Sequence, residues 1–207
     1  DFEPYYEHAG ITIYHGDCRE ILPGLEADVV VTDPPYGICY GGFPANIGAR
    51  AYNPIAGDAT QKDAEWLLRQ WTAPIVIFGA HEFPHLLHAG GRWFCWDKRL
   101  TVKADKMIGT PFELAWENRP GKNVMLRCLH GGVVNANGHG RPRQHPTEKP
   151  IPMLRILLDY CQPGIILDPF MGSGTTLRAA KDLGRKAIGI ELEEKYCEIA
   201  AKRLQQE

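Results

Sequence analysis

Short runs of apolar residues alternate along the chain with longer segments in which apolar residues recur every three or four positions. The short runs are typical of strands buried on both faces of a sheet. Strands are therefore predicted at residues 11–14, 29–32, 75–78, 93–96, 112–116, 165–167 and 187–190. The spaced segments predict helices after Thr60, at 151–161, at 175–183 and in the last segment. This alternation predicts an α/β fold with a mostly parallel, seven-stranded sheet and helices on both faces.

Two stretches follow neither pattern. Residues 37–58 are rich in Gly, Ala, Asn and Pro and predict a long loop, and residues 119–144 predict an irregular insertion. The length of 207 residues, with 44% hydrophobic and 23% charged residues, predicts one globular domain over residues 1–207. The chain begins with Asp1, so we expect that an initiator or a short leader has been removed.

Composition narrows the class of protein further. No apolar run approaches the ~18 residues of a membrane span, so no membrane association is expected. Six cysteines are scattered without the CxxC or CxxH spacing of a zinc site. We therefore expect no metal and a reducing, cytoplasmic environment, in a bacterium or a phage-infected host.

The net charge of −2 hides an uneven distribution of charge. Between residues 119 and 149 the chain carries a single acidic residue, Glu148, and a charge of +5, which leaves −7 for the rest. A solvated basic loop and a nucleic-acid contact both remain open on charge alone. The basic residues of this segment are Arg119, Lys122, Arg127, Arg141, Arg143 and Lys149.

A glycine turn joins a predicted strand to a predicted helix. Its residues are Asp168, Pro169, Phe170, Met171, Gly172, Ser173, Gly174, Thr175 and Thr176. Glycines let a ligand approach the backbone, and the free N–H groups of the following helix favour a negative group. The turn lacks the Lys of a P-loop, and Leu177 occupies the third glycine position of a dinucleotide fingerprint.

The remaining candidate ligand of the turn is S-adenosylmethionine, which carries a carboxylate but no pyrophosphate. Asp168, at the end of one strand, could receive its ammonium group. Glu191 lies 17 residues beyond Gly174, at the end of the next strand, where a carboxylate can accept ribose hydroxyls. A tight structural turn with an exposed Glu191 is the alternative.

A second candidate site is Asp33-Pro34-Pro35-Tyr36, directly after the predicted strand 29–32. Prolines lack an N–H group, so the Asp33 carboxylate and the Pro34 carbonyl are acceptors with few competing donors. Two such acceptors could grip the hydrogens of an exocyclic amine and turn its lone pair toward a methyl donor. Tyr36 offers a flat face for stacking a base. A proline-rich strand exit without function is the alternative.

Asp33-Pro34-Pro35-Tyr36 resembles the DPPY motif of amino-group DNA methyltransferases, and residues 170–174 resemble their FxGxG cofactor motif. The segment 145–150, His-Pro-Thr-Glu-Lys-Pro, lies between them. The catalytic motif precedes the cofactor motif, as in the circularly permuted β-class adenine-N6 methyltransferases, and the resemblance covers nearly the whole chain. It implies a Rossmann-like fold that binds S-adenosylmethionine, with double-stranded DNA as partner and, as in many related enzymes, a possible homodimer.

The resemblance also implies roles for individual residues. The target base would be held by Asp33, Pro34, Pro35 and Tyr36. The cofactor would be bound by Asp17, Asp33, Thr147, Lys149, Asp168, Phe170, Gly172, Ser173, Gly174, Thr175, Thr176 and Glu191. The insertion 119–144 falls where such enzymes recognise their target, with DNA phosphates contacted by Lys122, Arg127, Arg141 and Arg143.

The implied reaction is transfer of a methyl group to N6 of an adenine flipped out of the duplex. Methylation of cytosine N4 is the nearest rival, although Ser more often precedes Pro-Pro-Tyr in those enzymes. RNA or protein-amide methylation, and a DNA-binding protein that keeps the fold without catalysis, are further alternatives. None of the cysteines follows a proline, which argues against cytosine-C5 chemistry. The DNA recognition sequence and a companion nuclease cannot be read from the chain.

Overall fold

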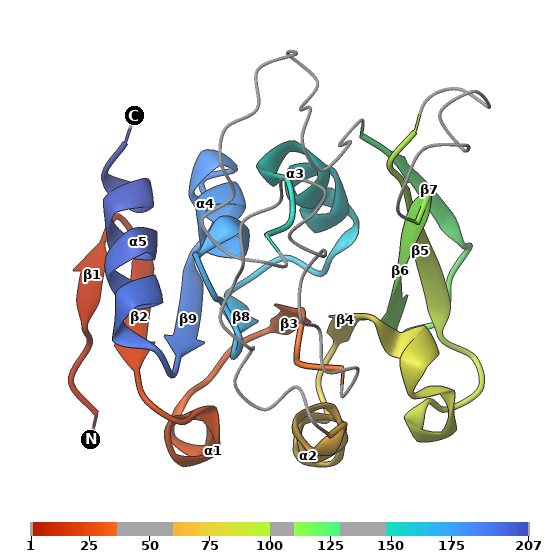
Figure 1. Ribbon diagram of the computed structural model, residues 1–207, viewed down its shortest axis with the longest axis horizontal. Helices are drawn as coiled ribbons and strands as arrows, with labels where there is room; N and C mark the ends of the chain where they lie inside the picture. Colours follow the sequence, from red (N-terminus) through yellow and green to blue (C-terminus); the bar gives the residue numbers. More distant parts are fainter. Residues whose placement is uncertain (1, 37–59, 100–109, 129–147, 207) are drawn as a thin grey trace, which may run out of the picture.

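The computed structural model of the protein describes residues 2–36, 60–99, 110–128 and 148–206. Within these residues one nine-stranded sheet, ordered β1-β2-β9-β8-β3-β4-β6-β5-β7, runs through the molecule (Figure 1). Its strands are β1 (Tyr6–His8), β2 (Ile11–His15), β3 (Val29–Thr32), β4 (Ile75–Phe78), β5 (Arg92–Asp97), β6 (Phe112–Glu117), β7 (Val124–Arg127), β8 (Ile166–Asp168) and β9 (Ala187–Glu191). The helices are α1 (Cys18–Ile21), α2 (Lys62–Gln70), α3 (Ile151–Tyr160), α4 (Thr175–Asp182) and α5 (Glu194–Gln205).

Most strands run in one direction. Only β1 and β6 are antiparallel to their neighbours in the described sheet. The other strands pair in parallel or are related through β6, so their carboxyl ends meet at one edge of the sheet. We call this the carboxyl edge, and the edge where these strands begin the amino edge.

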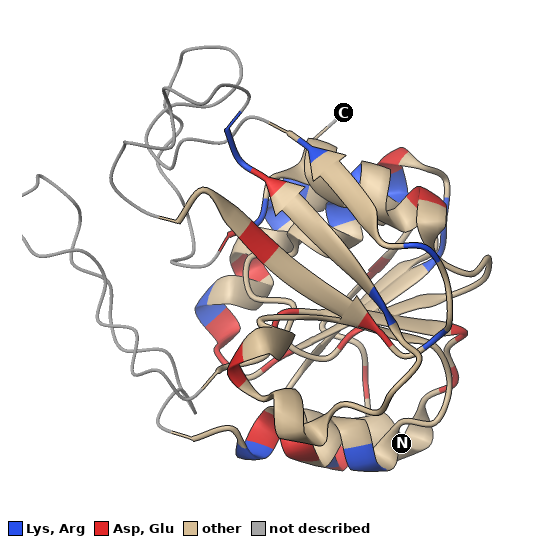
Figure 2. Cartoon of the chain, turned by 90° about the vertical axis from the view of Figure 1, so that its right-hand side faces the viewer, with Lys and Arg blue, Asp and Glu red and all other residues tan. Residues whose placement is uncertain are grey.

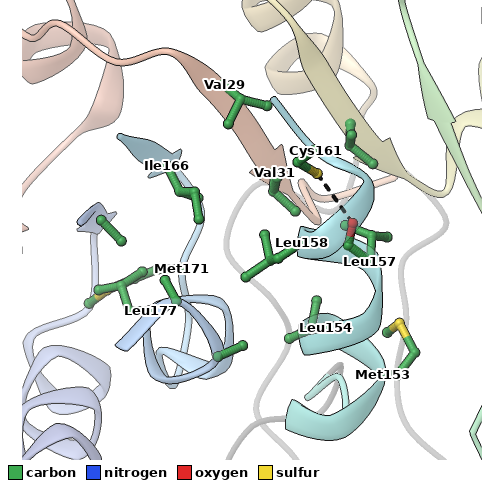
Figure 3. Packing of buried hydrophobic residues seen from close by; sticks show 14 of the residues in the cluster. Val29, Val31, Met153, Leu154, Leu157, Leu158, Cys161, Ile166, Met171 and Leu177 are labelled. Atoms are coloured by element: carbon green, nitrogen blue, oxygen red, sulfur yellow. Dashed lines mark hydrogen bonds between the residues drawn. The ribbon is translucent and has the colours of Figure 1, made fainter. Parts of the chain in front are cut away.

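The helices form one layer on each face of the sheet. Helices α3, α4 and α5 cover one face, and α1 and α2 cover the other (Figure 1). Alternate residues of β3 enter the two cores, because Val29 and Val31 pack toward α3 and α4 whereas Val30 packs toward α1 and α2. Figure 3 shows Val29 and Val31 facing the apolar side of α3 and its neighbour α4. Burial on both faces explains why β3 is continuously apolar.

The predicted fold class is confirmed, and the predicted strands 29–32 and 75–78 match β3 and β4 residue for residue. The sheet is two strands wider than the seven predicted. The description of residues 119–144 as irregular was wrong in part, because β7 lies within them. Only Leu126 of β7 is buried, and β1 buries no residue fully, so neither edge strand has the four consecutive buried residues found in β3 and β4.

The two predicted sites meet where the chain changes direction across the sheet. Strand β3 lies between β8 and β4. From β3 the chain proceeds to β4 on one side, whereas from β8 it proceeds to β9 on the other side. Such a topological switch point opens a crevice at the carboxyl ends of the strands, where open α/β sheets bind their ligands.

Candidate functional site

The strands that lead into the two motifs are joined at the switch point by a side-chain hydrogen bond. Asp168 ends β8, is 3% exposed and accepts a hydrogen bond of 2.7 Å from the Thr32 hydroxyl at the end of β3. The Phe170 N–H donates to the same carboxylate oxygen at 3.2 Å. Burial raises the pKa of Asp168 to about 6, although hydrogen bonds from Thr176 and Thr32 oppose the rise. One buried carboxylate therefore links the glycine turn to the end of β3, directly before the DPPY segment.

Asp33 follows β3 and has a partner on each carboxylate oxygen. The Tyr36 hydroxyl donates to Oδ1, and the Lys149 ammonium donates to Oδ2. The Asp33 side chain is 15% exposed, and its burial raises the pKa to about 6 against the opposing charge of Lys149. Pro34 beside it is buried. The carboxylate is thus aligned before any ligand binds.

Gly79 determines where the Tyr36 ring lies. This glycine follows β4 with a φ of +69°, and a Cβ atom at its position would stand 2.1 Å from Cε1 of Tyr36. Its N–H donates to the Leu114 carbonyl at 3.0 Å, which holds the backbone of β4 against β6. A side chain here would displace the Tyr36 ring. Sequence reasoning missed Gly79, because only the pairing of distant strands brings it beside the DPPY segment.

Lys149 links Asp33 to a second carboxylate that sequence reasoning also missed. Its ammonium lies 3.4 Å from Oε2 of Glu113 on β6, and Lys98 pairs with the other oxygen of Glu113. Burial lowers the pKa of Lys149, but the charges of Asp33 and Glu113 outweigh it and raise the pKa overall. Burial likewise raises the pKa of Glu113, but Lys149 and Lys98 outweigh it and lower the pKa to about 2. The charged residue Glu113 within the otherwise largely apolar strand 112–117 was the feature of the sequence that could have indicated it.

The glycine turn has the backbone geometry that the sequence predicted. Gly172 and Gly174 have φ values of +50° and +74°, and Gly174 caps the N-terminus of α4. A Cβ atom at Gly174 would stand 2.6 Å from Cβ of Ala200. Ser173, Thr175 and Thr176 are buried at the same turn, and Phe170 is partly buried.

Arg203 of α5 ties this turn to the segment that carries Lys149. Its guanidinium donates to the Ser173 carbonyl at 2.6 Å and to the Ser173 hydroxyl at 2.9 Å. It also donates to Oε1 of Glu148 at 2.7 Å. The last helix therefore holds the glycine turn and residues 148–150 together.

Glu191 ends β9 and closes the other side of the turn. Its carboxylate accepts hydrogen bonds from the N–H groups of Gly172 at 3.0 Å and Glu193 at 2.7 Å, and burial raises its pKa. Each oxygen keeps a second lone pair that a ribose hydroxyl could use. Asp17 lies beyond the neighbouring strand β2, where its side chain caps α1 through the Arg19 N–H at 2.9 Å.

This set of groups fits S-adenosylmethionine. Two left-handed glycines leave a backbone cradle at the start of a helix, where a carboxylate group is favoured. The buried carboxylate of Asp168 and the partly buried carboxylate of Glu191 flank the cradle, and their raised pKa values indicate incomplete compensation by the protein. Such carboxylates can pair with a cationic amine and accept hydrogen bonds from ribose hydroxyls.

The basic residues proposed to contact DNA do not lie together. Arg127 ends β7 at the carboxyl edge, whereas Lys122 precedes β7 at the amino edge, and both are exposed. Arg119 forms an ion pair with Glu117, and Lys149 forms one with Asp33. Neither side chain is therefore part of a solvated basic loop. Figure 2 shows acidic and basic residues interspersed over the described helices. Arg141, Arg143 and Thr147 lie outside the described residues.

Two further properties hold for the part of the chain that the structure describes. No helix there is long and apolar enough to cross a membrane. No cluster of three or more His, Cys, Asp and Glu residues is arranged there to hold a metal ion.

Comparison with known sequences identifies relatives over nearly the whole chain. A family model described as DNA methylase, for N6 and N4 methyltransferases, matches residues 60–202. The type II methyltransferase M2.DpnII of Streptococcus pneumoniae is 54% identical over 259 residues, covering 99% of this chain and 93% of that protein. The putative methylase YubD of Escherichia coli (strain K12) is 32% identical over 214 residues, covering 91% and 88%.

Solved structures match as well. The complex of M1.HpyAVI with S-adenosylmethionine shares 25% identity and a TM-score of 0.59, over 94% of this chain and 100% of that one. The PvuII DNA methyltransferase, described as cytosine-N4-specific, gives a TM-score of 0.65 at 16% identity, over 100% and 91%. At that identity the match shows that the PvuII enzyme and this chain share a fold.

Proposed function

This chain belongs to the family of N6/N4 DNA methylases and uses S-adenosylmethionine, and from that membership we propose that it methylates N6 of adenine in double-stranded DNA. The observation that carries the proposal is the hydrogen bond between the strand ends that precede the two motifs, in which Thr32, the residue before Asp33, donates to Asp168 at the start of the cofactor turn. A base held by the DPPY segment and a cofactor held by the glycine turn would meet at one edge of the sheet. The whole chain would act as one methyltransferase domain, with residues 119–144 selecting the target.

Asp33, Pro34 and Tyr36 would bind the flipped base. The carboxylate of Asp33 and the carbonyl of Pro34 each accept one amino hydrogen, which directs the nitrogen lone pair away from them. Pro35 contributes a fixed backbone and no competing N–H donor. Tyr36 stacks on the base, and the pairing of its hydroxyl with Asp33 fixes the tilt of its ring.

The glycine turn and the neighbouring strand ends would hold the cofactor. Asp168 receives the ammonium, the start of α4 receives the carboxylate, and Glu191 receives the ribose hydroxyls. The surrounding contacts would come from Asp17, Thr147, Lys149, Phe170, Gly172, Ser173, Gly174, Thr175 and Thr176. When bound, the cofactor supplies an electrophilic methyl carbon on sulfur, and the C–S bond breaks as the amine lone pair forms the N–C bond.

Asp33 would stabilise the charge that develops on the amine. The nitrogen becomes cationic as it gains the methyl group, and a carboxylate already aligned beside it lowers the free energy of that state. The proton then leaves the methylated amine for water, so no strong base is required. Phosphate contacts from Arg127 at the carboxyl edge, with Arg141 and Arg143, would hold the duplex, whereas Lys122 at the amino edge would lie away from it.

The test is the product itself. Purified protein, S-adenosylmethionine and plasmid DNA are incubated, and the digested nucleosides are quantified by mass spectrometry. We expect N6-methyladenine; N4-methylcytosine in its place would overturn the adenine assignment and keep the family, and the absence of both would overturn the proposed activity.

Substitution of Asp33 tests its assigned role. Asp33→Ala should lower the rate of methyl transfer by about 10²–10³-fold, because the aligned acceptor is lost. Cofactor affinity, measured by calorimetry, should change little. Asp28→Ala is the matched control, since Asp28 precedes the same strand at the amino edge, where it accepts from the Ile165 N–H. Full activity of Asp33→Ala would contradict the role.

A further inference from the structure

A chain of four charged side chains leads from Asp33 into the neighbouring strands. Lys149 contacts Asp33 after β3 and Glu113 on β6, and Lys98, just after β5, contacts the other oxygen of Glu113. The Lys149 side chain is 9% exposed and that of Glu113 is 30% exposed. Lys149 can donate to both carboxylates because an ammonium group has three N–H donors.

The charge on Lys149 creates a problem for amine methylation. The target nitrogen becomes cationic during transfer, and Lys149 holds a second positive charge on the same carboxylate. Two unit charges of like sign repel each other more strongly in such a buried setting than in water. Asp33 can serve the developing cation fully only if Lys149 moves toward another anion.

Glu113 is placed to be that anion. Its Oε2 atom is 3.4 Å from the Lys149 ammonium, so a small movement of a flexible side chain completes a hydrogen bond. Lys98 fixes the opposite oxygen of Glu113, which keeps the carboxylate in place. The pKa of Glu113, lowered to about 2, leaves it ionised throughout any practical assay.

We propose that Glu113 is a positioning residue that draws the Lys149 ammonium away from Asp33 when the target amine binds. Asp33 then presents its negative charge to the nitrogen that receives the methyl group. The four side chains remain balanced in charge throughout, with two anions and two cations. This inference rests on the proposed amino-group methyl transfer and adds a residue outside both sequence motifs.

The variant Glu113→Gln removes the second anion with little change in shape. We expect kcat to fall about tenfold, with the KM for S-adenosylmethionine within about twofold, because Lys149 now stays on Asp33. Glu117→Gln is the matched control on the same strand, since Glu117 is also buried and ion-paired but lies at the amino edge. The control should melt at a lower temperature and keep its kcat.

The pH profile separates positioning from a structural role. Lys149, Glu113, Lys98, Tyr36 and Asp168 are the charged and titratable groups that act on Asp33 among the described residues. Glu113 raises the pKa of Asp33, so its removal should move the acid limb of kcat/KM from near pH 6 to lower pH. Glu117→Gln should leave the acid limb unchanged.

A double-mutant cycle with Lys149→Met completes the experiment. If Glu113 acts through Lys149, Glu113→Gln should have little further effect on kcat in the Lys149→Met background. Fully additive losses, or a Glu113→Gln enzyme with the parent kcat and acid limb, would overturn the inference. Failure of the parent enzyme to methylate DNA would instead overturn the proposed function, so the two failures are distinct.

Discussion

The two edges of the sheet both bury carboxylates, but they compensate them differently. At the amino edge, Glu117 is 0% exposed and lies between the guanidinium groups of Arg92 and Arg119. Those guanidinium groups also donate to the Tyr160 carbonyl at 3.0 Å and the Gln162 side chain at 3.1 Å. Every charge in this cluster has a partner of opposite sign or a fixed dipole.

At the carboxyl edge the compensation is incomplete. Asp168 receives a threonine hydroxyl and a backbone N–H, and burial still raises its pKa to about 6. Asp33 has a cation, yet its pKa is also raised to about 6. Removal of one partner from a buried ion-pair cluster destabilises a fold, whereas buried carboxylates with raised pKa values are typical of functional sites, where a ligand supplies the missing partner. The degree of charge compensation therefore distinguishes a carboxylate buried for stability from carboxylates buried for function within one sheet.

The largest expected effect comes from opening the closed cluster. Glu117→Ala should lower the free energy of unfolding by about 3 kcal/mol, because Arg92 and Arg119, whose side chains are 15% and 34% exposed, lose their buried anion. The activity per folded molecule should remain, since the change lies at the amino edge. Urea unfolding together with an assay below the transition measures both. A stable variant, or a folded variant with low activity, would erase the distinction between the edges.

At the carboxyl edge, Asp168→Asn should raise the free energy of unfolding near neutral pH and weaken cofactor binding. The folded pKa of about 6 exceeds the ordinary value of 3.8 for an aspartate, so Asp168 contributes stability below pH 3.8 and loses it as pH rises through about 6. The neutral amide should therefore raise the free energy of unfolding at pH 8 by up to about 3 kcal/mol. Chemical denaturation at pH 8 and pH 4 tests this, because the gain should disappear at pH 4. Cofactor affinity should fall at the same time, and a gain that persists at pH 4 would contradict the cause given.

Two glycines sharpen the comparison through the backbone. Gly79 and Gly184 have φ values of +69° and +66°, but a Cβ atom meets Tyr36 at the first position and nothing within 4 Å at the second. Both alanine variants should lose about 1–2 kcal/mol of stability from the left-handed conformation. Only Gly79→Ala should also lose about tenfold in kcat, through displacement of Tyr36. Equal kinetics of the two variants would mean that the position of Tyr36 is unimportant.

The smallest expected effect concerns DNA binding. Arg127→Ala, at the carboxyl edge, should weaken binding modestly and reduce the slope of log affinity against log salt by about one. Lys122→Ala, at the other end of β7, should leave the slope unchanged. Fluorescence anisotropy over a salt series measures both variants. The same loss for each would show that the duplex reaches both edges.

Most of the fold could be predicted because most strands are buried on both faces. β3 and β4 each place alternate residues in two different cores, which forces a continuously apolar sequence that can be recognised without a structure. β7 was missed because its apolar run, Val124-Met125-Leu126, is only three residues long and lies among Gly and Asn residues. Charge and glycine content gave no indication of strand pairing within residues 119–144.

The candidate site was predicted only where its residues are contiguous in sequence. Asp33 and Asp168 stand in short motifs beside turns, so their chemistry is visible in the chain itself. The pairing of β6 with β4 and β5, a register that a single sequence does not contain, brings Glu113 and Lys98 near Asp33 and Gly79 beside Tyr36. Lys149 was expected near the cofactor, and its pairing with Asp33 joins residues 116 positions apart in the chain.

Arg203 lies in the last turn of α5, so its contacts also couple the order of this helix end to the order of the cofactor turn. Helix ends open more readily than helix centres, and opening here would release Ser173 and Glu148 together. Order at the end of α5 and order in the cofactor turn are therefore thermodynamically linked, and the linkage acts in both directions. A ligand that orders the cofactor turn should therefore also order the last turn of α5, so the order of this helix end should depend on whether the cofactor site is occupied.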